Sequence, residues 1–288
     1  MGKLQVCKIE FDDVRGVYTP GQDVTGTLIM ELEKELNVRE IRMKCVGWGE
    51  VHWTQTIQSV GPGQKPKSET IHINGEESYF KSVIALYGKA VDTGEWLPQG
   101  RHLFHFSFTL PSTLPSSYND KYGNIVYEVS VVLDLDYWSS NEIVRKEFKV
   151  VSDLDLNKYP AAEEPTEIQN FKYLCCWCCK SGPITGILRI CRTGYVPGDS
   201  ILFDFTIKNR SRRVCGVSVL FIKETIYHAK GEKKVCVTEI DKSRYEDVMP
   251  GDTQTWDEEE FEVPSVPPPC LEGCKIITID HYIKVIMK

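Results

Sequence analysis

Cysteine is the most reactive residue type in this chain, and four of the 11 cysteines lie in one short run, Cys175-Cys176-Trp177-Cys178-Cys179. Two overlapping CxxC pairs could bind zinc through thiolates, or exchange disulfides where a thiol pKa is lowered. The neighbouring residues have the pattern of a strand, so alternate cysteines point to opposite faces and each CxxC pair is split. We therefore expect packed or surface thiols here and no bound metal, with palmitoylation as a further alternative.

No catalytic signature accompanies these thiols. The chain has no H-E-x-x-H, G-x-S-x-G or Walker sequence. The glycines of Gly47-Trp48-Gly49 and Gly61-Pro62-Gly63 are not followed by a helical pattern, as a phosphate-binding loop requires. Six histidines are scattered along the chain: His52, His72, His102, His105, His228 and His281. We predict that the protein is not an enzyme and uses no cofactor.

Basic residues offer a candidate binding surface. Arg42 and Lys44 are two residues apart in a strand-like run, so they share a face, and Arg145 and Lys146 occur in another such run. Together these four residues could form a concave face for a phosphorylated or acidic peptide, or for anionic lipid head groups. Ordinary surface charge is the alternative. A weaker candidate of the same kind consists of Arg212, Arg213 and the run 230–234.

The composition excludes several classes of protein. With 288 residues, 41% of them hydrophobic and 26% charged, the chain is typical of a soluble protein of about two domains. Its 41 acidic and 34 basic residues give a net charge of −7, which argues against nucleic acid as a partner. No apolar run is long enough for a membrane helix, and the first residues have no signal-peptide pattern. The odd number of cysteines then favours a reducing, cytoplasmic compartment.

Alternation of apolar and polar residues dominates the chain and predicts strands. In one run Phe104, Phe106, Phe108 and Leu110 fall on one face. No long segment has the 3.6-residue period of a helix, and Pro-Gly pairs separate the runs. We predict an all-β protein built from antiparallel β-sandwiches. The clearest strand-like runs are residues 24–32, 103–110, 126–135, 201–208, 217–226 and 276–287.

The two halves of the chain repeat each other. The run Tyr18-Thr19-Pro20-Gly21-Gln22-Asp23-Val24 matches residues 195–201, and residues 108–115 match residues 261–268 in the same order. Two tandem sandwiches of like topology explain this repeat. We expect a first domain at 1–157, a linker at 158–170 that is polar and contains prolines, and a second domain at 171–288.

These motifs resemble those of the arrestins, and more closely the α-arrestins, the arrestin domain-containing proteins that include thioredoxin-interacting protein. The Tyr-x-Pro-Gly openings are similar in both halves, as is the pair Phe108-Thr109-Leu110-Pro111 and Tyr122-Gly123-Asn124-Ile125-Val126-Tyr127. The run from Cys175 through Ser181-Gly182-Pro183-Ile184 is very similar to the opening of the second α-arrestin domain. The resemblance covers nearly the whole chain and implies the arrestin fold, two immunoglobulin-like sandwiches.

The resemblance also implies a function. Members are cytoplasmic adaptors, recruited to the plasma membrane or endosomes, that bind the cytoplasmic tails or loops of membrane-protein cargo. They act in endocytosis, protein transport, ubiquitin-linked sorting and signal transduction, and recruit ubiquitin ligases through PPxY motifs. This sequence contains no PPxY, so we expect any ligase binding to be indirect. An anionic membrane surface is a further candidate partner, and nucleic acid is not one.

Three alternatives stay open at this point. One is a thiol- or metal-linked redox regulator resembling thioredoxin-interacting protein, although the thioredoxin-binding cysteine of that protein aligns with Thr253 here. Another is a decoy that occupies cargo without delivering ligase, because the PPxY motif is missing. The third concerns the second sandwich, which compared with the family could lack its last strands and so leave an edge open to pairing.

Overall fold

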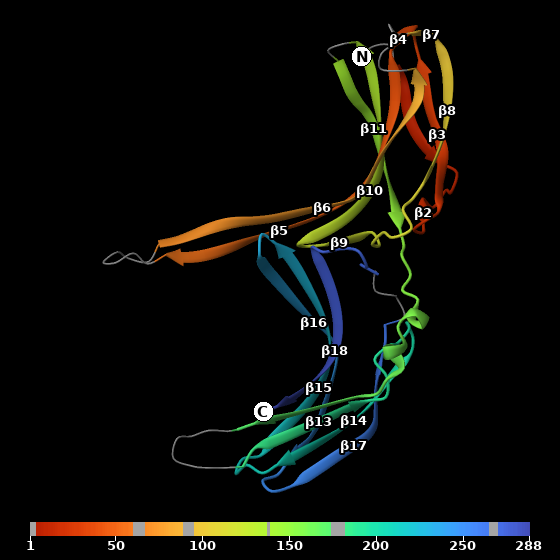
Figure 1. Ribbon diagram of the computed structural model, residues 1–288. Coiled ribbons are helices and arrows are strands. Elements are labelled where there is room, and N and C mark those ends of the chain that lie inside the picture. The colour runs from red at the N-terminus through yellow and green to blue at the C-terminus, as the bar shows by residue number, and fades with distance from the viewer. Residues whose placement is uncertain (1–3, 60–66, 89–94, 137–138, 174–181, 265–269) are drawn as a thin grey trace. The chain divides into compact units, whose positions relative to one another are not determined.

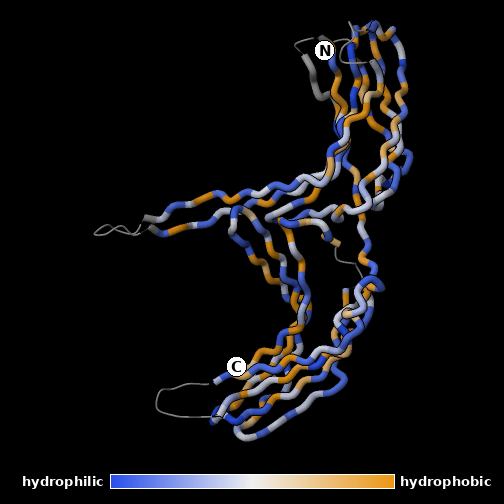
Figure 2. The backbone as a smooth tube through the Cα atoms, viewed as in Figure 1, coloured by the Kyte–Doolittle hydropathy of each residue, from blue (hydrophilic) through white to orange (hydrophobic). Residues whose placement is uncertain are grey.

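The computed structural model describes residues 4–59, 67–88, 95–136, 139–173, 182–264 and 270–288 (Figure 1). Apart from two short 3-10 helices, the regular structure of these residues is entirely β-strand. The all-β prediction is therefore confirmed. Hydrophobic and hydrophilic residues alternate along the strands (Figure 2), which is the pattern from which the strands were predicted. No helix in the described ranges is both long and apolar enough to cross a membrane.

The strands of the N-terminal half form two larger sheets and one small one. One has the order β1-β3-β8, the second has the order β2-β11-β10-β5-β6 with β9 beside β10, and β4 pairs with β7. The bounds are β1 Leu4–Phe11, β2 Val17–Tyr18, β3 Asp23–Leu32, β4 Leu36–Val38, β5 Glu40–Ser59, β6 Lys67–Gly88, β7 Glu95–Leu97, β8 Gly100–Thr109, β9 Tyr118–Asp120, β10 Gly123–Asp136 and β11 Ser139–Val150.

Aromatic side chains join the two larger sheets into a sandwich. The ring of Phe148 on β11 lies 5.9 Å from that of Phe11 on β1 and 6.3 Å from that of Phe108 on β8, centroid to centroid. Edge-on contacts of this kind are favoured over stacked faces because of the ring quadrupole. The face of β10 that carries Tyr127 and Val129 is fully buried between the sheets, as the alternation predicted. This core fixes β11 beside β1.

The C-terminal half forms a sheet of order β12-β13-β14-β17 and a sheet of order β16-β15-β18. Its core holds the stacked rings of Phe203, Phe205 and Phe261, all almost completely buried. The bounds are η1 Leu156–Lys158, η2 Pro160–Glu163, β12 Thr166–Lys172, β13 Ile184–Ile190, β14 Ser200–Asn209, β15 Cys215–Ala229, β16 Glu232–Val248, β17 Thr253–Glu262 and β18 Ile277–Met287. The segment 158–170 thus contains η2 and the start of β12.

The repeated motifs make equivalent backbone bonds in both halves. The amide of Leu110 donates to the carbonyl of Gln22 at 3.0 Å, and the amide of Val263 donates to the carbonyl of Asp199 at 2.8 Å. In each half the turn glycine just before this bond has a positive φ, 81° in the first and 87° in the second, which favours glycine. Each Pro-Gly turn is therefore hydrogen-bonded to the residue that follows the edge strand of its own sheet, β8 in the first half and β17 in the second.

Contacts divide the chain into two compact units. The first unit comprises Met1–Asp153, Ile226–Lys234 and Pro269–Thr278; the second comprises Leu154–Thr225, Val235–Pro268 and Ile279–Lys288. The first unit thus includes the turn between β15 and β16. Within it, the hydroxyl of Tyr227 donates to the carboxylate of Asp120 at 2.7 Å.

Candidate functional site

The outer edge of β1 is the first element of the candidate site. β1 pairs with β3 on one side, and no described strand pairs with its other side. The amide of Asp12 donates to Thr25 of β3, so the backbone groups of even-numbered residues point toward β3. Since successive residues of a strand alternate, the backbone groups of Cys7, Ile9 and Phe11 point outward. Such an edge can accept a further strand.

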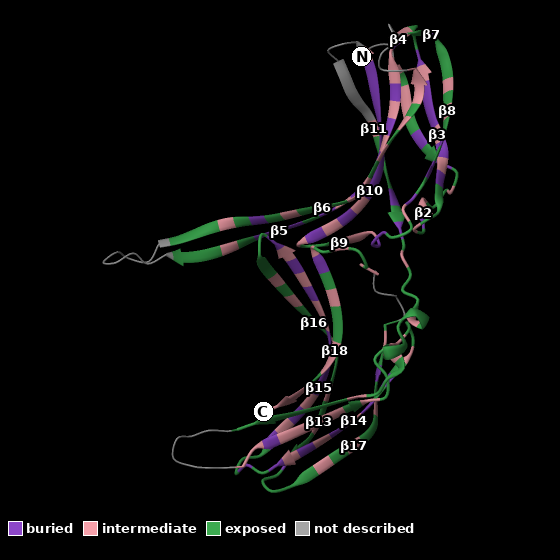
Figure 3. Cartoon of the chain, in the orientation of Figure 1, coloured by how far each residue is buried: buried purple, intermediate pink, exposed green. Residues whose placement is uncertain are grey.

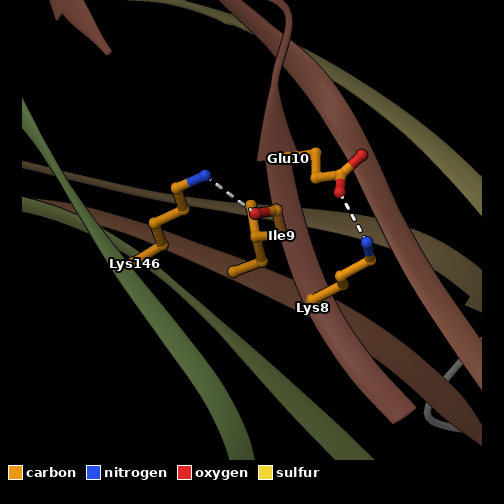
Figure 4. Close-up of polar contacts among 4 residues, drawn as sticks. All are labelled: Lys8, Ile9, Glu10 and Lys146. Carbon is orange, nitrogen blue, oxygen red and sulfur yellow. Dashed lines mark hydrogen bonds and ion pairs between the residues drawn. The ribbon is translucent and has the colours of Figure 1, made fainter. Parts of the chain in front are cut away.

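Lys146 of β11 closes part of this edge. Its ammonium Nζ donates to the carbonyl oxygen of Ile9 at 3.0 Å (Figure 4). The same Nζ lies 4.9 Å from the ring centroid of Phe11. On β1 itself, Lys8 Nζ donates to Glu10 Oε1 at 2.6 Å. The hydrogen bond and charge of Lys8, with a smaller contribution from Lys146, lower the pKa of the Glu10 carboxyl. The edge therefore carries fixed charges of both signs.

A cavity of about 750 Å³ adjoins the edge. Phe11, Tyr127 and Phe148 supply its aromatic lining, and Lys146 and Lys149 contribute basic side chains. Arg15 also lines it, with a guanidinium that is paired with Asp13 at 3.6 Å and largely exposed. Glu147 lines the cavity as well, so its walls combine aromatic, basic and acidic side chains. An acidic or phosphorylated side chain could pair with the lysines there.

The structure brings three of the four sequence candidates together, Arg42, Lys44 and Arg145. Lys44 on β5 and Arg145 on β11 both pair with Ser130 of β10, which lies between them. Arg42 is two residues from Lys44 and points the same way, onto the face of the sheet away from the core. Lys146, next to Arg145 on β11, points to the opposite face, because consecutive residues of a strand alternate. The single shared face expected from the sequence is therefore split between two faces.

The face that carries Arg42, Lys44 and Arg145 is mixed in charge. Arg42 Nη1 is 3.2 Å from Glu40 Oε2, and both side chains are largely buried. Glu128 pairs with Glu147, two residues along from the pair Ser130 and Arg145. Both carboxylates are therefore on the same side of the sheet as Arg145. Acidic neighbours thus offset part of the positive charge, so this face is less strongly basic than the sequence alone indicated.

The cysteines that the structure describes are poor nucleophiles in several cases. Burial raises the pKa of Cys7 to about 11 and that of Cys45 to about 12. Cys274, whose pKa burial also raises, accepts a hydrogen bond from the hydroxyl of Tyr79 at 3.2 Å. The Cys175–Cys179 cluster lies outside the described residues. Within the described ranges, no group of three or more His, Cys, Asp or Glu side chains could hold a metal ion.

Alkylation should follow this difference in environment. Among the cysteines that the structure describes, we expect iodoacetamide at pH 8 to modify exposed Cys191 first and Cys7 and Cys45 last, as judged by mass spectrometry of peptides. A thiol with a pKa of about 11 is ionised in only about one molecule in a thousand at that pH, and the thiolate is the reactive form. Alkylation of Cys45 as fast as that of Cys191 in the folded protein would contradict this.

Comparison with known proteins agrees with the geometry. The model of the arrestin (or S-antigen) N-terminal domain matches residues 7–157, and that of the arrestin (or S-antigen) C-terminal domain matches residues 180–288. The chain belongs to the arrestin family. This arrestin-family chain is therefore placed in a family of non-catalytic binding proteins, and the sequence-based recognition is confirmed.

Relatives of this arrestin are arrestin domain-containing proteins, the α-arrestin branch. It is 30% identical to arrestin domain-containing protein 17 of Caenorhabditis elegans over 304 residues, which cover 99% of this chain and 68% of the relative. It is 30% identical to arrestin domain-containing protein 1 of Mus musculus, covering 100% and 62% respectively. With arrestin domain-containing protein 4 of Homo sapiens the identity is 29%, over 99% and 67%. The chain thus spans between about three fifths and two thirds of these relatives' length.

Proposed function

We propose that this arrestin-family chain is an adaptor that binds cytoplasmic tails or loops of membrane-protein cargo for endocytosis and ubiquitin-linked sorting. It would act in the cytoplasm, at the plasma membrane or at endosomes, with ubiquitin ligases recruited indirectly. Its two sandwiches would span 1–157 and 171–288, joined by the linker 158–170. The observation that carries the cargo-binding proposal is the outward edge of β1, where the carbonyl of Ile9 accepts a bond from Lys146.

Cargo would bind as an added strand. The amides and carbonyls of Cys7, Ile9 and Phe11 point outward, so an extended segment could form ladder bonds along them, as in β-augmentation. Such a segment would displace Lys146 from the Ile9 carbonyl. The displaced ammonium would then be free to pair with a carboxylate or phosphate of the cargo, which would favour acidic segments over neutral ones.

Side chains of the cargo would provide the specificity. Ladder bonds are the same for every sequence, so discrimination comes from pockets for alternate side chains. The cavity beside β1, with Phe11 and Lys149 in its lining, would take one of them. Arg42, Lys44 and Arg145 lie on the outer face of the other sheet, on β5 and β11, and would form a second contact region for acidic groups or anionic lipid, weakened by Glu40.

Replacing Cys7 by proline tests strand addition. The Cys7 amide points outward, so Cys7→Pro removes no bond to β3 but removes a donor to the incoming strand, and edge strands tolerate proline at such positions. In cells, proximity labelling by the wild-type chain should enrich integral membrane proteins, and we expect Cys7→Pro to reduce that enrichment about tenfold. Lys146→Glu should selectively lose cargo with acidic segments.

Cys7→Ala is the matched control, because it removes the same thiol but keeps the amide. It should label membrane proteins as the wild type does, and thermal unfolding should show that Cys7→Pro remains folded. Equal labelling by Cys7→Pro and wild type would refute strand addition at β1. Failure of the wild-type chain to label membrane proteins would refute the adaptor role itself.

A further inference from the structure

The outer edge of β18 is open. β18 pairs with β15 on one side, and no described strand pairs with its other side. Gly216 and Lys288 exchange backbone hydrogen bonds of 2.9 and 3.0 Å, and the amide of His228 donates to the carbonyl of Ile276 at 2.8 Å. The same number of residues separates these points on both strands, so the register is unbroken. Backbone groups of even-numbered residues of β18 therefore point toward β15, and those of odd-numbered residues point outward.

Apolar side chains along this edge are incompletely buried. Ile283, Val285 and Met287 pack against the core of the second sandwich, yet each is only partly buried, and so is Ile279. Figure 3 shows half-buried and exposed residues along β18. On the neighbouring strand β15, by contrast, the core residue Val219 is 0% exposed. The open edge thus leaves apolar surface in water that a further strand would cover.

Two opposite charges on β18 determine how it could pair with the β18 of a second copy. Asp280 and Lys284 are exposed and share a face with Tyr282, which lies midway between them. Neither forms an ion pair with any residue that the structure describes. In an antiparallel pair with Tyr282 opposite the partner's Tyr282, Asp280 lies opposite the partner's Lys284. Two-fold symmetry then forms the same ion pair twice.

Other antiparallel registers are less favourable. Moving the symmetry axis by one residue leaves both charges opposite uncharged residues, and moving it by two places Asp280 or Lys284 opposite its own copy, where like charges repel. With the axis at Tyr282, the outward backbone groups of Ile279 meet those of the partner's Val285, so ladder bonds and ion pairs favour the same register.

We propose that two copies of this chain associate through their β18 edges as an antiparallel, two-fold symmetric pair. The sheet β16-β15-β18 then continues from one copy into the other, and the half-buried apolar side chains of β18 are covered. The edge strand β17 of the other sheet does not suit such self-pairing, because residues 257–260 are all acidic and two copies would repel. The association does not involve the edge of β1.

Sedimentation velocity of the full chain over a series of concentrations tests the proposal. We expect the wild type to dimerise, and Asp280→Lys and Lys284→Asp each to raise the dimer Kd about tenfold, because each change turns two attractive pairs into repulsive ones. An equimolar mixture of the two variants should form a mixed dimer as tight as the wild type, since every charge again faces its opposite. The double variant Asp280→Lys/Lys284→Asp should recover the dimer for the same reason.

The matched control is Glu239→Lys, which makes the same change of charge at an exposed position on β16, the opposite edge of the same sheet. It should dimerise as the wild type does, and thermal unfolding should confirm that all variants are folded. A wild type that stays monomeric would overturn the proposal. So would a mixture that fails to recover the dimer, or a control that loses as much affinity as Asp280→Lys.

Discussion

The Phe205→Ala variant is expected to lower the free energy of unfolding of the second unit by about 4 kcal/mol. Phe205 is 1% exposed, and its ring stacks on Trp256 at 4.6 Å and meets Tyr245 edge-on at 4.8 Å. Alanine would remove the ring and leave a cavity that two large neighbours, each held by its own strand, cannot collapse to fill. The lost aromatic contacts add to the lost burial.

Denaturant unfolding followed by near-ultraviolet circular dichroism would measure this loss, with hydrogen exchange of β14 and β17 locating it in the second unit. Leu202→Ala is the control, because Leu202 is on the same strand but 46% exposed, so its truncation should cost less than about 0.5 kcal/mol. A Phe205→Ala variant as stable as Leu202→Ala would show that this aromatic cluster does not hold the sandwich together.

Much of the fold could be predicted because the alternation is regular. The expected run 201–208 corresponds to β14, Ser200–Asn209, and the run 217–226 lies within β15, Cys215–Ala229. One feature of β10 was not predictable in this way. Both of its faces are buried, including Ser130 and Val132 on the face away from the core, because β5 and β11 flank it with long side chains. The alternation of apolar and polar residues predicts that one face of each strand is exposed to solvent.

The candidate site was less predictable, since it depends on pairing between distant strands. The sequence put Arg145 and Lys146 on one surface, although consecutive residues of a strand point to opposite faces. The role of the β1 edge depends on Asp12 bonding to Thr25, a pairing that no local pattern reveals. The Asn-x-Ser turn at Asn209 did carry a local signal, because these residues hydrogen-bond their own backbone in turns.

Asn209→Ala is the second substitution with a large expected effect, a loss of about 3 kcal/mol in the free energy of unfolding. The amide side chain makes four hydrogen bonds of 2.7 to 3.0 Å in a fully buried position. Alanine would leave the carbonyls of Arg213 and Val248 without this donor, and each buried unsatisfied group costs about 1 to 3 kcal/mol. Entry of water would recover part of the loss.

The same variant links stability to the order of the turn from Arg210 to Arg213. Without Asn209 the turn from Arg210 to Arg213 would lose its order, so hydrogen exchange at its amides should accelerate even under conditions where the protein stays folded. Ser211→Ala serves as the graded control: it removes the one hydroxyl that donates to Asn209 Oδ1 and should cost only about 1 kcal/mol. If Asn209→Ala matched Ser211→Ala in stability and in the exchange of the turn, the turn would not depend on the Asn209 side chain for its arrangement.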